Sequence, residues 1–165
     1  MKHLNQFITE YIIKKKLDKP IDSEDHYEYF PKTKEELENI CIDLINNDNF
    51  DLNCIDVSNI TDMHELFSNI DLKCSEDIQH IDIDKWDVSN VTNMRAMFEG
   101  CMDLDCDLSC WNVSNVESMS LMFENCSNFT GKGLDNWNVS KLKNKILRIF
   151  NNCKKLKKIP DWNKL

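Results

Sequence analysis

The stretch WNVSNVESMSLMFENC, residues 111–126, repeats almost letter for letter the stretch WDVSNVTNMRAMFEGC at residues 86–101. Weaker copies are IDVSNITDMHELF at residues 55–67 and WNVSKLKNKILRIFNNC at residues 137–153, and residues 159–165 begin another. The valines that align in the four copies are 31, 25 and 26 residues apart: Val57, Val88, Val113 and Val139. A catalytic motif usually occurs once, whereas a segment recurring at this period is typical of units that stack on one another.

The second half of each copy has the spacing of an amphipathic helix. Apolar residues recur at i, i+3, i+6 and i+7, which places them on one helical face; in the second copy they are Val91, Met94, Met97 and Phe98. A serine precedes this set where an N-cap is expected: Ser58, Ser89, Ser114 and Ser140. Glu117, three residues after Ser114, completes a capping box. We therefore expect one helix per repeat, with the methionines and phenylalanines in the core.

The first half of each repeat alternates apolar and polar residues, which is typical of a strand. The pattern is clear in MDLDCDLSCW, residues 102–111, and in HIDIDKW, residues 80–86. In parallel strands stacked about 4.8 Å apart, four aspartates would share one exposed face: Asp82, Asp84, Asp105 and Asp107. Trp86 and Trp111 stand where these strands end. The sequence thus predicts a binding face of carboxylates with two aromatic anchors, a residue type enriched in binding hot spots.

The first fifty residues do not repeat. Residues 4–12 show helical spacing, and Thr33 with Glu36 forms a capping box before a second apolar stripe: Leu37, Ile40, Cys41, Leu44 and Ile45. A stack of repeats exposes apolar surface and strand edges at its ends and needs a capping unit there. We interpret residues 1–50 as an N-terminal helical capping region and residues 51–165 as about four repeats plus a partial one. A separate binding domain is the alternative for residues 1–50.

The repeated pattern W-D/N-V-S-N-V-x-x-M-x-x-M-F-x-x-C resembles the BspA-like leucine-rich repeats of bacterial surface proteins, over residues 51–165. The resemblance implies a curved α/β solenoid that makes protein contacts, adhesion in the best-known members, without catalysis. We therefore predict an α/β fold: a short leucine-rich-repeat solenoid with parallel strands, one helix per repeat and an N-terminal helical cap. Residues 71–79 depart from the pattern as an irregular insertion.

Hydropathy and composition bear on location and source. No apolar run approaches the roughly 20 residues of a membrane span. The first 17 residues lack the uninterrupted apolar region of a signal peptide, because Asn5, Gln6, Thr9 and Glu10 interrupt it. We expect a cytoplasmic protein, in a bacterium or an infected host cell. The single alanine and two arginines, against many lysines and asparagines, indicate A/T-rich codons and hence a low-GC bacterium or its phage.

The sequence offers no convincing catalytic or metal-binding motif. Cys101, Cys126 and Cys153 each follow a phenylalanine by three residues, which predicts packed thiols; disulfides are not expected without export. Zinc sites usually contain C-x2-C pairs, which are absent from the sequence. The D-x-D-x-D run that begins at Asp103 has Leu108 where a calcium loop requires glycine. We therefore predict no enzyme, no cofactor and no metal.

Charge is distributed unevenly along the chain. Residues 51–140 carry a net charge of −13 and residues 141–165 a net charge of +8. The acidic middle argues against nucleic acid as the ligand and favours a protein partner with a basic surface, bound less well as salt rises. The predicted function is a non-enzymatic protein–protein interaction module. The alternative is a structural spacer in a virion or another assembly.

Overall fold

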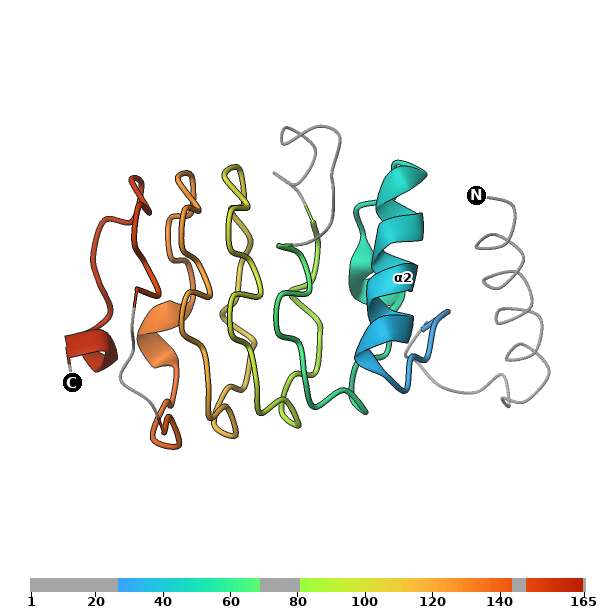
Figure 1. Ribbon diagram of the computed structural model, residues 1–165, viewed down its shortest axis with the longest axis horizontal. Helices are drawn as coiled ribbons and strands as arrows, with labels where there is room; N and C mark the ends of the chain where they lie inside the picture. The colour runs from blue at the N-terminus through green and yellow to red at the C-terminus, as the bar shows by residue number, and fades with distance from the viewer. Residues whose placement is uncertain (1–26, 69–80, 144–147, 165) are drawn as a thin grey trace.

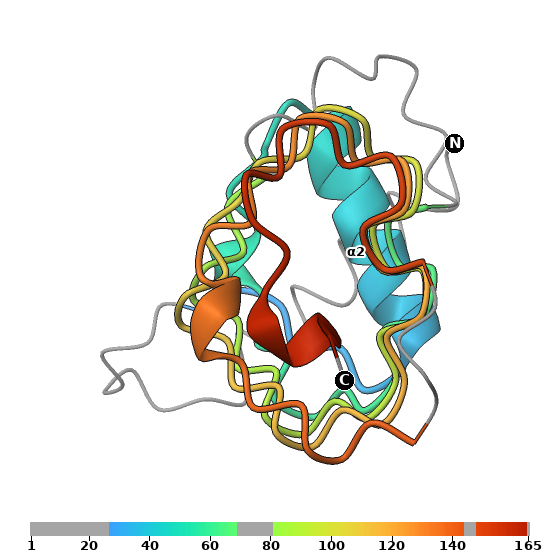
Figure 2. The same ribbon diagram turned by 90° about the vertical axis from the view of Figure 1, so that its left-hand side faces the viewer.

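The computed structural model describes residues 27–68, 81–143 and 148–164. They form coils of backbone that lie side by side, with helix α2 (Lys34–Asn46) at one end of the stack (Figure 1). Viewed along the stack, successive coils overlay one another around a shared interior (Figure 2). The described parts of the coils are residues 50–68 (coil 1), 81–101 (coil 2), 102–126 (coil 3), and 127–143 with 148–153 (coil 4).

The predicted α/β leucine-rich-repeat solenoid, with a parallel strand and a helix in each repeat, is wrong. Within the described ranges, α2 is the only α-helix, and the other helical elements are three short 3-10 helices: η1 (Leu52–Cys54), η3 (Leu134–Asn136) and η4 (Asp161–Lys164). Strand pairing in the same ranges is limited to four isolated parallel bridges: Tyr29–Ile55, Asp51–Asp82, Asp62–Asn93 and Asn93–Ser118. The coils therefore consist mainly of turns and extended backbone.

Left-handed backbone explains why the predicted helix of each repeat does not form. In coil 2, Ala96 has φ 54° and Gly100 has φ 79°. The aligned residues of other coils also have positive φ: Glu65, Leu121 and Arg148 at the first position, Asn125 and Asn152 at the second. A right-handed helix cannot contain such residues. Glycine and asparagine at the second position suit this conformation. The residue types at the first position (Glu, Ala, Leu and Arg) do not indicate it.

Backbone hydrogen bonds run between coils instead of within a helix. Alternate amides of coil 2 donate to coil 3: Met94 N to Ser118 O (2.8 Å), Ala96 N to Ser120 O (2.9 Å) and Phe98 N to Met122 O (3.0 Å). Of the intervening amides, Met97 N donates to Met94 O in the same coil (3.3 Å), and Arg95 N donates to the side-chain oxygen Asn93 Oδ1 (3.2 Å). Coil 1 donates to coil 2 in the same way. Each coil thus satisfies buried backbone groups of its neighbour, as those groups require.

The predicted core positions are confirmed, although the conformation around them is different. The rings of Phe67, Phe98, Phe123 and Phe150 stack in sequence, with centroids 5.3, 5.5 and 5.8 Å apart. The aligned methionines are buried: Met63, Met94, Met97, Met119 and Met122. The thiols of the cysteine column also bond between coils, as from Cys126 Sγ to Phe98 O (2.9 Å). The seven cysteines within the described ranges are all free thiols.

The polar letters of the repeat form turns and bridges between coils. Asp87 Oδ1 accepts the amide of Ser89 (3.0 Å), so this serine lies in an Asx turn rather than at a helix N-cap. Asn115 Nδ2 donates to Ser89 O of the preceding coil (2.6 Å). The capping box predicted at Ser114 is wrong, and Glu117 instead pairs with Lys143 of coil 4.

Helix α2 matches the local prediction. Thr33 Oγ1 accepts the amide of Glu36 (3.1 Å), and Glu36 Oε2 accepts the amide of Lys32 (2.7 Å). The buried residues of α2 are the predicted stripe: Leu37, Ile40, Cys41, Leu44 and Ile45. The helix predicted within residues 4–12 and the insertion at 71–79 lie outside the described residues, so the capping role of residues 1–50 stays a prediction. No helix in the described part of the chain is long and apolar enough to cross a membrane.

Candidate functional site

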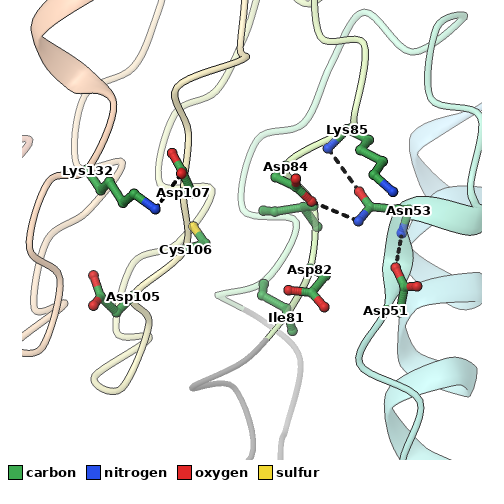
Figure 3. Close-up of a pocket in the computed structure, with 11 residues that line it drawn as sticks. Asp51, Asn53, Ile81, Asp82, Asp84, Lys85, Asp105, Cys106, Asp107 and Lys132 are labelled. Atoms are coloured by element: carbon green, nitrogen blue, oxygen red, sulfur yellow. Dashed lines mark hydrogen bonds and ion pairs between the residues drawn. The ribbon is translucent and has the colours of Figure 1, made fainter.

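A hollow of about 530 Å³ lies on one side of the stack and is lined by residues of all four coils (Figure 3). The four aspartates predicted as a binding face all line it: Asp82, Asp84, Asp105 and Asp107. Three residues of coils 1 and 4 join them: Asp51, Asn53 and Lys132. The remaining lining residues are Ile81, Ile83, Lys85 and Cys106. Five aspartates against two lysines make the hollow strongly acidic.

Asp107 is held by an ion pair between coils 3 and 4. Its carboxylate accepts Lys132 Nζ at 2.6 Å, and it also accepts the amide (3.0 Å) and hydroxyl (2.5 Å) of Ser109. The Lys132 hydrogen bond, followed by those from Ser109, lowers the pKa of Asp107 to about 2. The same pair raises the pKa of Lys132. A general acid needs a pKa near the working pH, so Asp107 is suited to binding cations rather than to acid catalysis.

The other predicted aspartates differ in how firmly they are held. Asp84 Oδ1 accepts Asn53 Nδ2 of coil 1 at 2.9 Å. Asp105 Oδ1 accepts both the amide (3.1 Å) and the hydroxyl (2.7 Å) of Thr130 in coil 4. The exposed carboxylate of Asp82 makes no hydrogen bond or ion pair with the described part of the chain. Asp82 is therefore the carboxylate most available to a partner.

Replacing Lys132 with methionine should raise the pKa of Asp107 toward the ordinary aspartate value of about 4. The pKa of folded Asp107 lies below its unfolded value, so the pair stabilises the protein above about pH 4 and this contribution disappears as pH falls toward 2. A carboxyl-carbon NMR titration measures the change. Lys85→Met is the control, because Lys85 lines the same hollow without pairing with Asp107. An unchanged Asp107 pKa in Lys132→Met would refute the assignment.

Trp86 and Trp111 are not the surface anchors that the sequence predicted. They are only 3% and 4% exposed, and their Nε1 groups donate to Leu52 O (2.9 Å) and Ile83 O (3.0 Å) of the preceding coils. A buried indole needs an acceptor for its N–H, and the stack supplies one in each case. The aromatic-anchor prediction is therefore corrected, since both rings belong to the core.

The predicted alternation in residues 102–111 holds only in part. Leu104 and Leu108 are buried, whereas Met102 is 51% exposed and Cys110 is also exposed. Turns in this segment, rather than a regular strand, break the period of two. The alternation holds around Asp82, which is exposed between buried Ile81 and Ile83.

Sequence reasoning missed Asp51, Asn53 and Lys132. Asp51 could have been found, because it precedes a buried core residue just as Asp82 and Asp107 do in the aligned copies. Lys132 lies in a stretch of coil 4 that does not match the repeated sequence pattern. Only the stacking of coil 4 on coil 3 brings it to the hollow.

The arrangement is suited to binding positively charged groups. In the described ranges, no group of three or more histidine, cysteine, aspartate or glutamate side chains is placed to hold a metal ion. Carboxylates fixed by neighbouring amides and hydroxyls present a preorganised set of acceptors for lysine or arginine side chains.

Comparison with known proteins gives a family but no characterised relative. No curated protein and no solved structure matches the chain. One family model matches residues 41–162, which include all the residues that line the hollow. The chain therefore belongs to the family described as "Mycoplasma protein of unknown function, DUF285".

Proposed function

We propose that this chain is a non-enzymatic protein-interaction module that binds a basic surface of its partner in the acidic hollow. The observation that supports this most directly is the gathering of five aspartates from three coils around one hollow of about 530 Å³. The resemblance of the repeat to BspA-like sequences, whose members make protein contacts, points the same way.

The construction of the hollow suits recognition. Its carboxylates come from coils joined by backbone hydrogen bonds and stacked rings, so little conformational freedom is lost when a partner binds. Complementary charge raises the rate of association and suppresses wrong partners. Binding should therefore weaken as salt screens the charges.

A rigid spacer is the second candidate function. The regular coil-to-coil bonding favours it, because such a stack holds its two ends at a fixed separation. A spacer needs no exposed acidic hollow. A substitution inside the hollow should therefore reduce partner binding if the chain is an interaction module, and should have no effect on binding if it is a spacer.

Asp82→Lys should remove binding without unfolding the protein, because the Asp82 side chain is exposed and has no partner in the described ranges. We expect capture of partner proteins from a cell lysate by the immobilised protein to fall about tenfold or more, since like charges placed together cost several kcal/mol. Quantitative mass spectrometry of the captured proteins measures the effect, and 0.5 M salt should reproduce it.

Glu28→Lys is the matched control, because it makes the same charge change at an exposed residue outside the hollow. It should capture the same proteins as the wild type. Asp105 and Asp107 are poorer choices for this test, since they hold Thr130 and Lys132 of coil 4. If Asp82→Lys captures everything that the wild type captures, the hollow is not the binding site.

A further inference from the structure

The bonding between coils is interrupted at the hollow. Residues 81–85 of coil 2 and residues 103–108 of coil 3 form no backbone hydrogen bond with each other. Elsewhere the backbones of the same two coils are joined, for example by Ala96 N to Ser120 O (2.9 Å) and Gly100 N to Glu124 O (2.8 Å). At the break itself, the bond between the coils comes from a side chain, Trp111 Nε1 to Ile83 O (3.0 Å). The break is therefore local, and the hollow lies beside it (Figure 3).

Aligned residues of three coils show what the break leaves unpaired. The amide of Leu52 donates to Asp82 O (3.0 Å), and the amide of Leu108 donates to Lys132 O (3.2 Å), each in the following coil. The amide of Ile83, at the same position in coil 2, has no acceptor among the described residues. Ile83 is fully buried and lines the hollow. Buried amides without an acceptor are rare and costly.

Cys106 lies on the other side of the break. Neither its amide nor its carbonyl forms a backbone hydrogen bond within the described chain. Residues whose backbone groups lack partners within the described chain thus line the hollow from both coils. An extended peptide supplies such partners when it adds to an exposed edge of a sheet, and its main-chain groups then provide affinity.

We propose that the break between coils 2 and 3 receives an extended peptide segment of a partner protein, with lysine or arginine at every second position. This rests on the proposed function and specifies the form of the partner. Backbone pairing at Ile83 fixes the peptide, and the carboxylates select its side chains. The unpaired amide and the charge of the hollow are independent features that point to the same ligand.

The arrangement of the carboxylates sets the spacing of the basic residues. Asp105 and Asp107 are two residues apart in coil 3, where residues 104–108 contain no turn. In coil 2, Asp84 follows Asp82 by two residues and begins a turn. Side chains two residues apart in extended backbone are about 6.6 Å apart and point the same way. A peptide with alternating lysines matches this period, whereas contiguous lysines point to opposite faces.

The experiment compares three labelled peptides by fluorescence anisotropy. The first is TKTKTKT, the second is its isomer TTKKKTT, and the third is TKTKTKT with alternate peptide bonds replaced by trans-alkene isosteres, which removes the carbonyl acceptors that the Ile83 amide needs as well as the N–H donors. All three carry the same charge, so differences among them report spacing and backbone pairing. We expect the first to bind at least about tenfold more tightly than either of the others, the effect of losing one or two hydrogen bonds.

Amide NMR locates the contact. The Ile83 amide proton should shift downfield when TKTKTKT binds, while the amides of Leu52 and Leu108, which already have acceptors, should shift little. Asp82→Asn should weaken binding of this peptide and Glu28→Gln should not, because Asp82 lines the hollow and Glu28 does not. Both substitutions preserve side-chain shape, and amide spectra of the free variants check that each is folded.

The outcomes separate this inference from the proposed function. Equal affinity for the alkene-modified and unmodified peptides would mean recognition by charge alone, which overturns the inference and leaves the proposed function standing. If no peptide binds but capture from lysate still depends on Asp82, the hollow binds a folded partner surface instead of an extended peptide. That result also overturns the inference and leaves the proposed function standing. If neither peptide binding nor capture depends on Asp82, both proposals fall.

Discussion

Phe123→Ala is expected to lower the free energy of unfolding by about 3–5 kcal/mol, the usual range for a buried phenylalanine. The ring is fully buried and stacks with three other rings, with centroid distances of 5.5 Å to Phe98, 5.8 Å to Phe150 and 4.2 Å to Phe129. Each coil depends on its neighbours, so the cavity should weaken coils 2 and 4 as well as coil 3. Urea unfolding followed by tryptophan fluorescence measures the loss.

Met102→Ala serves as the control for Phe123→Ala. Met102 belongs to the same coil but is 51% exposed, so its truncation should change the stability by no more than about 0.5 kcal/mol. A loss below about 1 kcal/mol for Phe123→Ala would contradict the stacked arrangement of the phenylalanines.

The core could be predicted from the sequence because burial follows from the repeat alignment, whatever the backbone conformation. Residues such as Val91, Met94 and Phe98 recur in register and turn inward in each coil. Their spacing indicates a helix, but a succession of turns also places the side chains at these positions in the core. The choice between them depends on bonds to the next coil, such as Ala96 N to Ser120 O, and these are not local in sequence.

Helix α2 was predictable because its signals are local. Thr33 and Glu36 cap it through contacts three residues apart, and its apolar stripe is continuous. By contrast, the left-handed conformation of Ala96 and Leu121 is imposed by the stack, since neither residue type favours it.

The sequence predicted most of the charged residues of the candidate site, but it did not predict the residues from other coils that hold them in place. Asp82 follows from the alternation of the segment around it, which local sequence shows. The burial of Trp86 cannot be predicted from local sequence, because the hydrogen-bond acceptor of its indole is a carbonyl 34 residues earlier in the chain. Lys132 reaches Asp107 only because coil 4 stacks on coil 3, a contact that no pattern within one repeat indicates.

Gly133→Ala is expected to destabilise the protein by about 2–5 kcal/mol. Gly133 has φ +92°, a left-handed conformation that costs a residue with a Cβ roughly 1–2 kcal/mol. The added Cβ would lie 2.3 Å from Ser109 N and 2.6 Å from the carbonyl carbon of Leu108. These are backbone atoms of coil 3 that cannot rotate away, so overpacking adds about 1–3 kcal/mol. Urea unfolding measures the total.

Gly100→Ala separates the two contributions to this loss. Gly100 also has positive φ, +79°, but a Cβ there would meet no atom within 4 Å, so only the conformational cost of roughly 1–2 kcal/mol applies. Gly133→Ala should also push coil 4 away from coil 3 and draw Lys132 from Asp107, raising the pKa of Asp107 from about 2, whereas Gly100→Ala should leave it low. Equal losses of stability in the two variants, with Asp107 unchanged in both, would mean that coils 3 and 4 do not approach each other this closely beside the hollow.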